Sequence, residues 1–160
     1  MSENTVSAPE YVPSPSERVR DQVARYEASG GTEGGTLDGR PVVILTTIGA
    51  ESGKVRKNPV MRVERDGVYV AIASAAGAAR DPQWYRNLLA HPEAQLQDGP
   101  VVRRVRVREV SGAEKSAWWQ LADSLNPNYP RYRANAGREI PVLALEPVGP
   151  GESAEPAEGE

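Results

Sequence analysis

An Asp-Gly pair at positions 66 and 67 constrains the fold of this chain more than any other feature of its sequence. The pair separates "KNPVMRVER" from "VYVAIASAA", and both flanking runs contain residues that favour strands. An Asp-Gly pair between two strand-like runs is a strong short-range signal for a β-hairpin. The sequence therefore predicts two antiparallel strands that meet at this turn.

Other runs of the sequence extend the same pattern. The β-branched run 41–49 predicts a buried strand, and the apolar run 140–148 predicts the last strand. A turn at Asp98-Gly99 leads into another valine-rich run, 101–110. Consecutive strands joined by tight turns pair antiparallel. We therefore expect an α+β fold, a mainly antiparallel split β-barrel of about six strands with peripheral helices.

The strand predicted over 101–110 has two different faces. Arg104, Arg106 and Arg108 alternate with valines, so the three arginines share one side of the strand. We interpret the arginine side as a solvent-exposed strand face. Anion binding on that face is the alternative.

Two helices are predicted from their start signals. The first spans 16–29, with Ser16 as its N-cap and apolar residues at helical spacing, and it is expected to pack on the edge of the domain. The second lies within 80–92, with Asp81 as the N-cap and Pro82 at the first helical position. Contact of the first helix with a membrane or a partner is the alternative to edge packing.

A third helix is predicted to run to Leu125. Ser111 and Glu114 have the spacing of a capping box, which marks the start of this helix. The proline- and asparagine-rich segment 126–139 is predicted to be a stiff, non-helical loop. That loop carries Tyr129, whose side chain is therefore expected to have a defined direction.

The two ends of the chain differ in composition from the middle. Residues 1–15 are rich in proline, and residues 149–160 are rich in glutamate and glycine. Neither end has enough apolar surface to offset the entropy of ordering. We expect one folded domain over 16–148, with a disordered tail on each side.

The composition excludes several classes of function. A formal net charge of −3 argues against nucleic-acid binding, and the absence of cysteine excludes thiol catalysis and thiolate metal sites. The one histidine, His91, precedes a proline at a predicted helix end, where a capping role is expected, and no metal site is predicted. No apolar run is long enough to span a membrane, so a cytoplasmic protein is expected. If the chain is an enzyme, a cofactor is expected to carry the chemistry.

The stretch "TTIGAESGKVRKNPV", residues 46–60, looks like a phosphate-binding loop. It lacks the glycine spacing of the nucleoside-triphosphatase loop, and the proline at 59 disfavours the helix which that loop requires. What remains is a glycine-containing turn between two strands. The amide and hydroxyl of Ser52, with the Arg56 guanidinium, are candidates to hold a phosphate. The alternative is an ordinary hairpin loop with surface cations.

Three segments together resemble a known family. They are "LTTIGAESGKVRKNPV", "YVAIASAAGAARDPQWYRNLLAHPEA" and "YPRYRANAGREIPVLALEP", and the likeness runs from about Val42 to Pro147. The sequence resembles the deazaflavin-dependent nitroreductases, actinobacterial split β-barrel proteins that use coenzyme F420, a 5-deazaflavin with a phosphate and an oligoglutamate tail. The resemblance implies a reductase that transfers a hydride from reduced F420 to a small quinone, enone or nitro acceptor.

The resemblance also implies a set of site residues. The expected cofactor-binding residues are Ala50, Glu51, Ser52, Arg56, Lys57, Asn58, Pro59, Val60 and Met61 along the tail, Ile72, Ala73, Ser74 and Ala75 at the ring, and Gln83, Trp84, Tyr85, Arg86 and Asn87 on the other side of the groove. Tyr129 is expected to face the ring from the substrate side as the catalytic hydrogen-bond or proton donor. Tyr132 is expected beside it, in contact with the substrate.

The chain departs from the family pattern at several positions. Basic residues are usual where this chain has Ala50, Glu51 and Ala75, an aromatic residue is frequent at Met61, and a tyrosine is frequent at Asn126. The lost basic residues favour the main alternative function, a non-catalytic F420 or small-ligand carrier on the same barrel. A flavin mononucleotide (FMN) enzyme is a further alternative. Because split barrels frequently dimerise, a homodimer is also expected as a possible assembly.

Overall fold

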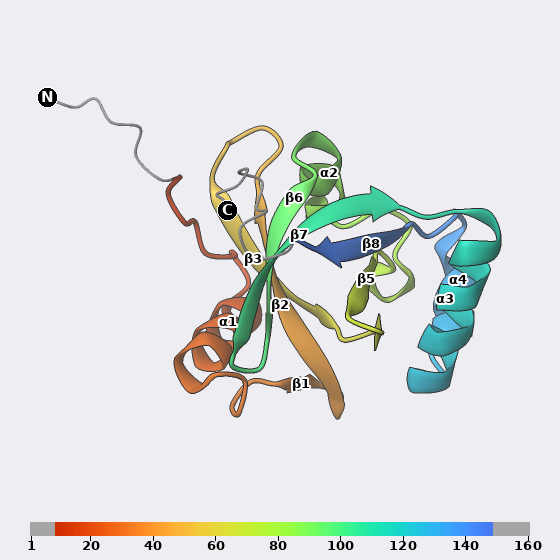
Figure 1. Ribbon diagram of the computed structural model, residues 1–160, viewed down its shortest axis with the longest axis horizontal. Coiled ribbons are helices and arrows are strands. Elements are labelled where there is room, and N and C mark those ends of the chain that lie inside the picture. Colours follow the sequence, from red (N-terminus) through yellow and green to blue (C-terminus); the bar gives the residue numbers. More distant parts are fainter. Residues whose placement is uncertain (1–8, 149–160) are drawn as a thin grey trace, which may run out of the picture.

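The computed structural model describes residues 9–148 (Figure 1). Its helices are α1 (Glu17–Ser29), α2 (Gln83–Ala90), α3 (Gly112–Leu125) and α4 (Tyr129–Ala136), with a short 3-10 turn η1 (Ala75–Gly77). Its strands are β1 (Thr36–Leu37), β2 (Arg40–Ile48), β3 (Val55–Met61), β4 (Glu64–Arg65), β5 (Val68–Ile72), β6 (Glu93–Asp98), β7 (Val101–Glu109) and β8 (Val142–Pro147). The predictions for residues 1–8 and 149–160 lie outside the described residues.

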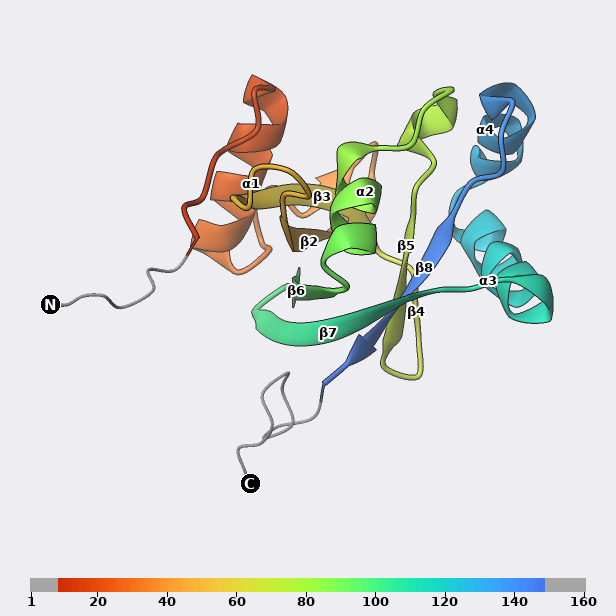
Figure 2. The same cartoon turned by 90° about the horizontal axis from the view of Figure 1, so that it is seen from above.

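The strands form one curled antiparallel sheet in the order β1-β2-β6-β7-β8-β5-β4, with β3 paired to β2 beside this path. Figures 1 and 2 show α1 at one end of the sheet and the α3–α4 pair at the other, with α2 between them. The predicted α+β, antiparallel, barrel-like fold is confirmed. The described residues form eight strands rather than about six, because the two-residue strands β1 and β4 are too short to produce a pattern.

The Asp-Gly turn lies where the sequence predicts it, between β4 and β5. Asp66 and Gly67 have φ values of 56° and 84°. Positive φ at both central residues is the requirement of the turn type that best matches the twist of paired strands. The Glu64 carboxylate accepts a hydrogen bond from the Gly67 amide at 2.8 Å, which closes the turn. The predicted hairpin is confirmed.

Strand β8 divides the core into two clusters because its two faces are both buried. Leu143 and Leu145 join a cluster inside the curl, under Trp84 and Leu88 of α2. Their neighbours on β8 face the opposite cluster, which α3 and α4 cover. The apolar run at the end of the chain is therefore the centre of the fold, and it holds α2 and α4 in place on opposite faces of the sheet.

Helix α1 forms as predicted. The Ser16 hydroxyl caps it by accepting a hydrogen bond from the Val19 amide, and Val23 and Tyr26 pack against β2. The Tyr26 hydroxyl donates toward the carbonyl of Val42 and accepts from the amide of Gly99. Helix α1 is thus fixed to the sheet by a polar contact as well as by apolar packing. Within residues 9–148, no helix is long and apolar enough to cross a lipid bilayer.

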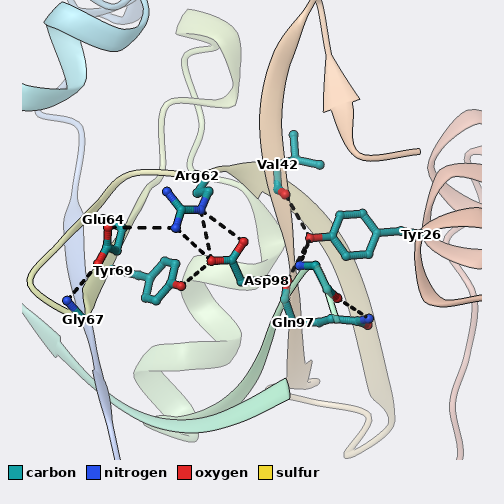
Figure 3. Close-up of polar contacts among 9 residues, drawn as sticks. Tyr26, Val42, Arg62, Glu64, Gly67, Tyr69, Gln97 and Asp98 are labelled. Atoms are coloured by element: carbon teal, nitrogen blue, oxygen red, sulfur yellow. Dashed lines mark hydrogen bonds and ion pairs between the residues drawn. The ribbon is translucent and has the colours of Figure 1, made fainter. Parts of the chain in front are cut away.

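A second polar group lies beside this contact and joins β5, β6 and the connection between β3 and β4 (Figure 3). Asp98, at the end of β6, accepts hydrogen bonds from the Arg62 guanidinium at 3.0 and 3.1 Å and from the Tyr69 hydroxyl. Partial burial raises the pKa of Asp98, but the bonds from Arg62 and Tyr69 lower it by more, so the net shift is downward. Arg62, Tyr69 and Asp98 are called the Asp98 network below.

Two predicted side-chain caps do not form, although Ser111 is the N-cap of α3 as predicted. Pro82 rather than Asp81 is the N-cap of α2, and the Asp81 carboxylate instead accepts a hydrogen bond from Arg138 at 2.7 Å. The capping box of α3 does not form, because Glu114 pairs with Arg108 through two bonds of 2.9 Å. In both cases a charged partner on another element binds the carboxylate in place of the helix amides.

The segment 126–139 is not the non-helical loop that its prolines predict, because Tyr129–Ala136 form helix α4. Pro130 lies in the first turn, where no amide is needed for helical bonding. Gly137 ends the helix with a φ of 69°. The prediction of a loop is wrong because Pro130 occupies a position that a helix permits.

Residues 10–12, which are predicted to belong to the N-terminal tail, pair with strand β3. The carbonyl of Glu10 accepts a hydrogen bond from the Val55 amide at 2.8 Å, and the Val12 amide donates to the Val55 carbonyl at 3.0 Å. This segment therefore pairs with the free edge of β3, although it has no strand-like apolar pattern. The open edge supplies the hydrogen bonds that the segment's own sequence does not predict.

The arginine face of β7 is exposed and paired with protein carboxylates. Arg106 lies 3.9 Å from Glu93, and Arg108 binds both Glu114 and Glu146. This agrees with the interpretation of a solvent-exposed face. His91 lies at the C-cap of α2, where its amide donates to the Asn87 carbonyl.

Candidate functional site

One cavity of about 320 Å³ opens between the curled sheet and the helices around it. Its size lies within the range that small-molecule sites occupy. The β1–β2 hairpin, β3, the end of β5 with η1, the start of α2, and α4 all contribute to it. Its lining residues are Arg18, Leu37, Asp38, Arg40, Val42, Pro59, Val60, Met61, Ile72, Ser74, Ala75, Ala76, Pro82, Trp84, Asn126, Tyr129 and Tyr132.

One wall of the cavity is the turn that follows β5. Ala75, Ala76 and Gly77 have φ values of 46°, 55° and 86°, in the left-handed region. For a residue with a side chain this conformation costs roughly 1–2 kcal/mol. Consecutive strained residues of this kind persist only where the surrounding structure holds them, and they gather at functional sites. The structure therefore maintains a strained backbone at the cavity wall.

Polar groups on this wall lack protein partners. Ser74 is only 8% exposed, and its hydroxyl has no hydrogen-bond partner among residues 9–148. In the same described part of the chain, the backbone amides of Ala75 and Ala76 also have no partner. Ala75 and Ala76 are exposed, so their amides are open to a ligand, whereas the Ser74 hydroxyl is buried. Because leaving a buried polar group unpaired costs about 1–3 kcal/mol, the Ser74 hydroxyl marks a candidate ligand site.

A second wall carries Tyr129, which is 3% exposed. Its ring packs edge-to-face against Trp119 and Tyr132, with centroids 5.5 and 5.9 Å away. Its hydroxyl lies 3.5 Å from the Met61 sulfur, a weak acceptor. Burial raises the pKa of Tyr129, and Arg40 opposes this rise. Tyr129 thus holds its proton at neutral pH, and its hydroxyl has no strong acceptor within the described range 9–148.

The β2–β3 loop, predicted to bind a phosphate, lies beside the cavity rather than in its lining. The Ser52 hydroxyl accepts a hydrogen bond from the Lys54 amide, so it stabilises the loop itself. Lys54 pairs with Glu10 at 3.1 Å, and Lys57 pairs with Glu27 at 2.5 Å. The Arg56 guanidinium has no hydrogen-bond or ion-pair partner among residues 9–148. Of the three cations in this stretch, Arg56 is therefore the one whose side chain is unpaired in the described structure.

Helix α2 holds this loop through Asn87, which is buried. The Asn87 amide group donates to the Thr47 hydroxyl at 3.1 Å, and its oxygen accepts from the Ala50 amide at 2.9 Å and from Gln83. These bonds occupy the Asn87 side chain within the protein. Burial, with a hydrogen bond to Glu109, raises the pKa of Tyr85 to about 12.

The predicted site residues therefore divide into two groups. Those that line the cavity are Pro59, Val60, Met61, Ile72, Ser74, Ala75, Trp84, Tyr129 and Tyr132. Those outside the lining are Ala50, Glu51, Ser52, Arg56, Lys57, Asn58, Ala73, Gln83, Tyr85, Arg86 and Asn87. Most of the second group lie on the adjoining loop and on α2, so the cavity and the loop form neighbouring parts of one region.

Two cations of the cavity were missed by the sequence reasoning. Arg18 comes from α1 and Arg40 from the start of β2, and both belong to the lining. Neither lies in a motif, and both come from elements that are far from Tyr129 in the sequence. No local pattern could have predicted their position, because the packing of α1 and the β1–β2 hairpin brings them to the cavity.

The family model described as "F420H(2)-dependent quinone reductase" matches residues 18–147, which is nearly all of the described chain. The chain belongs to this family. It is therefore an F420-dependent oxidoreductase, and the enzyme class and cofactor that the resemblance implied are confirmed. No finding favours the carrier alternative.

Relatives of this F420-dependent reductase cover most of its length. An F420H(2)-dependent quinone reductase of Mycobacterium tuberculosis is 30% identical over 132 residues, 80% of this chain and 87% of the relative. A solved F420-H2 dependent reductase, FDR-A, is 44% identical with a TM-score of 0.63, over 67% of this chain and 95% of that one. A structure described as a domain-swapped dimer is 42% identical with a TM-score of 0.65, over 83% of this chain and all of that one (100%).

Proposed function

We propose that the cavity holds the ring system of reduced F420 against a quinone, to which the enzyme transfers a hydride. The observation that carries this proposal is the wall at Ser74, where a buried hydroxyl and two exposed backbone amides have no partner among residues 9–148. A polar ring edge would satisfy these groups, and the aromatic side chains of Trp84 and Tyr129 suit a flat conjugated ligand. The residues present therefore fit the cofactor.

Arg56 is our candidate for the anionic tail of F420. It lies on β3 beside the cavity, and it has no carboxylate partner among the described residues, whereas Lys54 and Lys57 are paired. A guanidinium suits phosphate because its donors form a planar fork. Loss of a hydrogen bond to a charged group costs about 1.5–3 kcal/mol, so we expect Arg56→Ala to weaken F420 binding by that amount.

The bound cofactor supplies the hydride, and the protein must stabilise the charge that appears on the acceptor. Tyr129 is suited to this role because its buried hydroxyl keeps its proton and faces only a sulfur. A donor aimed at a developing oxyanion stabilises the transition state more than the ground state. Because its raised pKa makes it a poor acid, we assign hydrogen-bond donation to Tyr129, with the proton arriving from solvent.

The acceptor side of the cavity is assigned to Met61, Asn126 and Tyr132. These residues line the cavity together with Tyr129, and the Asn126 amide points its donor toward the Met61 sulfur at 3.6 Å. A flexible thioether adapts to planar apolar ligands of different shape. We infer that this side accepts a quinone ring rather than a strongly polar acceptor.

Cofactor titration followed by single-turnover kinetics tests the proposal. The purified chain is titrated with F420 by fluorescence, and the reduced complex is then mixed with a naphthoquinone while the absorbance of oxidised F420 is recorded. We expect binding and rapid oxidation, with no comparable binding of FMN. Binding without oxidation would favour the carrier alternative, and preferential binding of FMN would favour the flavin alternative.

We also propose a homodimer, which is supported by the related structure described as a domain-swapped dimer. Light scattering coupled to gel filtration tests this directly. A mass near 17.3 kDa, that of one chain, at all concentrations would contradict it.

A further inference from the structure

The side chain of Arg138 lies outside the cavity lining and hydrogen-bonds to the strained turn that forms one wall. It donates five hydrogen bonds into one short segment, to the carbonyls of Ala73, Ser74, Ala78 and Arg80 at 3.1, 3.2, 3.0 and 3.1 Å, and to the Asp81 carboxylate at 2.7 Å. Arg138 is separated from Asp81 by 57 residues, and its side chain is only 15% exposed. One long-range side chain thus spans the whole turn.

The segment to which Arg138 hydrogen-bonds contains the left-handed residues Ala75, Ala76 and Gly77. Within it, the Gly77 amide bonds the Ser74 carbonyl at 2.8 Å and the Ala78 amide bonds the Ala75 carbonyl at 3.0 Å. Among residues 9–148, no other side chain hydrogen-bonds to a carbonyl of the segment 73–80. Two short local bonds do not offset the strain at Ala75 and Ala76, which is roughly 1–2 kcal/mol each. The hydrogen bonds from Arg138 therefore supply additional stabilisation of the left-handed turn.

Arg138 also connects this turn to α4, which forms the wall that carries Tyr129. It follows Gly137, the residue that ends α4, and α4 carries Tyr129 and Tyr132. The helix packs closely against the turn, because a Cβ added to Gly77 would lie 3.1 Å from the Cα of Tyr132. The two walls of the cavity are therefore in direct contact at one point and are bridged by Arg138 at another.

We propose that Arg138 is a positioning residue that sets the shape of the cavity before ligand binds. It touches neither cofactor nor substrate. It keeps the turn left-handed, so that the amides of Ala75 and Ala76 and the Ser74 hydroxyl remain unpaired and available. Because a preformed site does not lose the free energy of rearrangement on binding, this raises the affinity for a planar ligand and fixes its distance to Tyr129.

The expected changes in F420 affinity and turnover rest on the proposed function. The expected change in the stability of the turn does not. Arg138→Lys is the informative variant, because a lysine retains the charge opposite Asp81 and cannot reach five acceptors with one ammonium group. Arg108→Ala is the matched control. Arg108 makes three bonds of 2.9 Å to Glu114 and Glu146, and none of these residues lines the cavity.

The first measurement uses the free full-length protein. Amide hydrogen exchange is recorded by NMR in Arg138→Lys, in Arg108→Ala and in the unaltered chain. We expect Gly77 and Ala78 to exchange at least about tenfold faster in Arg138→Lys only, while the strand amides keep their protection. Unchanged exchange at Gly77 and Ala78 in the folded variant would overturn the proposal, whether or not the chain binds F420.

The second measurement compares F420 affinity with turnover. For Arg138→Lys we expect the Kd for F420 to rise about tenfold and kcat/KM to fall about 100-fold, the scale for a misplaced reacting group. Arg108→Ala should keep both within about twofold. If Arg138→Ala folds, added guanidinium should restore part of its affinity. If the unaltered chain fails to bind F420, the proposed function fails and hydrogen exchange alone decides the role of Arg138.

Discussion

The Asp98 network and the wall at Ser74 both lie at strand ends, of β6 and β5 respectively, and their polar groups are satisfied in different ways. Asp98 ends β6 and accepts three hydrogen bonds from Arg62 and Tyr69. Ser74 follows the end of β5 and is more completely buried, yet its hydroxyl has no partner among the described residues. The comparison indicates that the polar groups of the Asp98 network stabilise the fold, whereas the Ser74 hydroxyl is available to a ligand.

The physical cost of the two arrangements differs. A buried polar group without a partner destabilises the fold by about 1–3 kcal/mol, whereas a satisfied one contributes about 0.5–1.5 kcal/mol. Natural proteins retain the first arrangement where function requires it. If this distinction holds, substitutions in the two regions should separate stability from function.

The largest effect is expected for Asp98→Ala. The substitution leaves the partly buried Arg62 guanidinium and the Tyr69 hydroxyl without their acceptor, so we expect the free energy of unfolding to fall by about 2–3 kcal/mol. Urea denaturation measures this. Glu93→Ala is the control, because its pairs with Arg104 and Arg106 are long and exposed, and it should change stability by less than about 0.5 kcal/mol. A loss as small as the control's would show that the network is not structural.

In the cavity, Tyr129→Phe should lower turnover without changing the stability of the fold. Among the described residues the hydroxyl has only a sulfur as partner, so its removal should leave the unfolding free energy within about 0.5 kcal/mol. Turnover with a quinone should fall about 10- to 100-fold, with F420 affinity within about twofold, because the lost donor acts in the transition state. Steady-state rates and cofactor titration measure both. Unaltered turnover would remove Tyr129 from the reaction.

Ser74→Ala should shift stability and affinity in opposite directions. Removal of an unpaired buried hydroxyl should raise the unfolding free energy by about 0.5–1 kcal/mol. The same change should weaken F420 binding about three- to tenfold, because the ligand loses a hydrogen bond. Ser116→Ala is a control at a serine outside the cavity lining. A Ser74→Ala variant that is less stable than the unaltered chain would show that the hydroxyl already has a structural partner.

The smallest effect concerns pH. The pKa of Asp98 is lowered from its ordinary value of 3.8, so its carboxylate stabilises the folded state above that value, and this contribution is lost as the pH falls through the lower, folded-state pKa. We expect the stability difference between the unaltered chain and Asp98→Asn to be constant from about pH 7 to about pH 5 and to shrink below about pH 4. Thermal unfolding across this range measures it. A difference that shrinks already near neutral pH would contradict the assignment.

The sequence predicted those elements that depend on neighbouring residues. The Asp66-Gly67 turn needs positive φ at two adjacent positions, and α1 needs a hydroxyl three residues before an amide. Both requirements are local, and both predictions are correct. The family resemblance likewise depended on segments that are continuous in the chain, and it was confirmed over residues 18–147.

Sequence patterns do not show where a distant group binds a local side chain. Asp81 was predicted to be an N-cap, and this is wrong because Arg138 binds its carboxylate across 57 residues. Lys57 stays a predicted cofactor-binding residue, and its pair with Glu27 of α1 could not be read from its own segment. A charged side chain forms its strongest bond with the nearest opposite charge, and only packing determines which charge that is.

The sequence by itself therefore determined the antiparallel strands, the helix over 17–29 and the family, because these follow from hydrogen bonds and side-chain patterns between residues that are close in the chain. The tertiary structure alone decided that residues 129–136 form a helix packed against the turn after β5 and that Arg138 binds the segment from Ala73 to Asp81. It also decided that the buried Ser74 hydroxyl has no partner in the part of the chain that the structure describes. A polar group's partners are set by what surrounds it in space, and burial makes both their presence and their absence matter energetically.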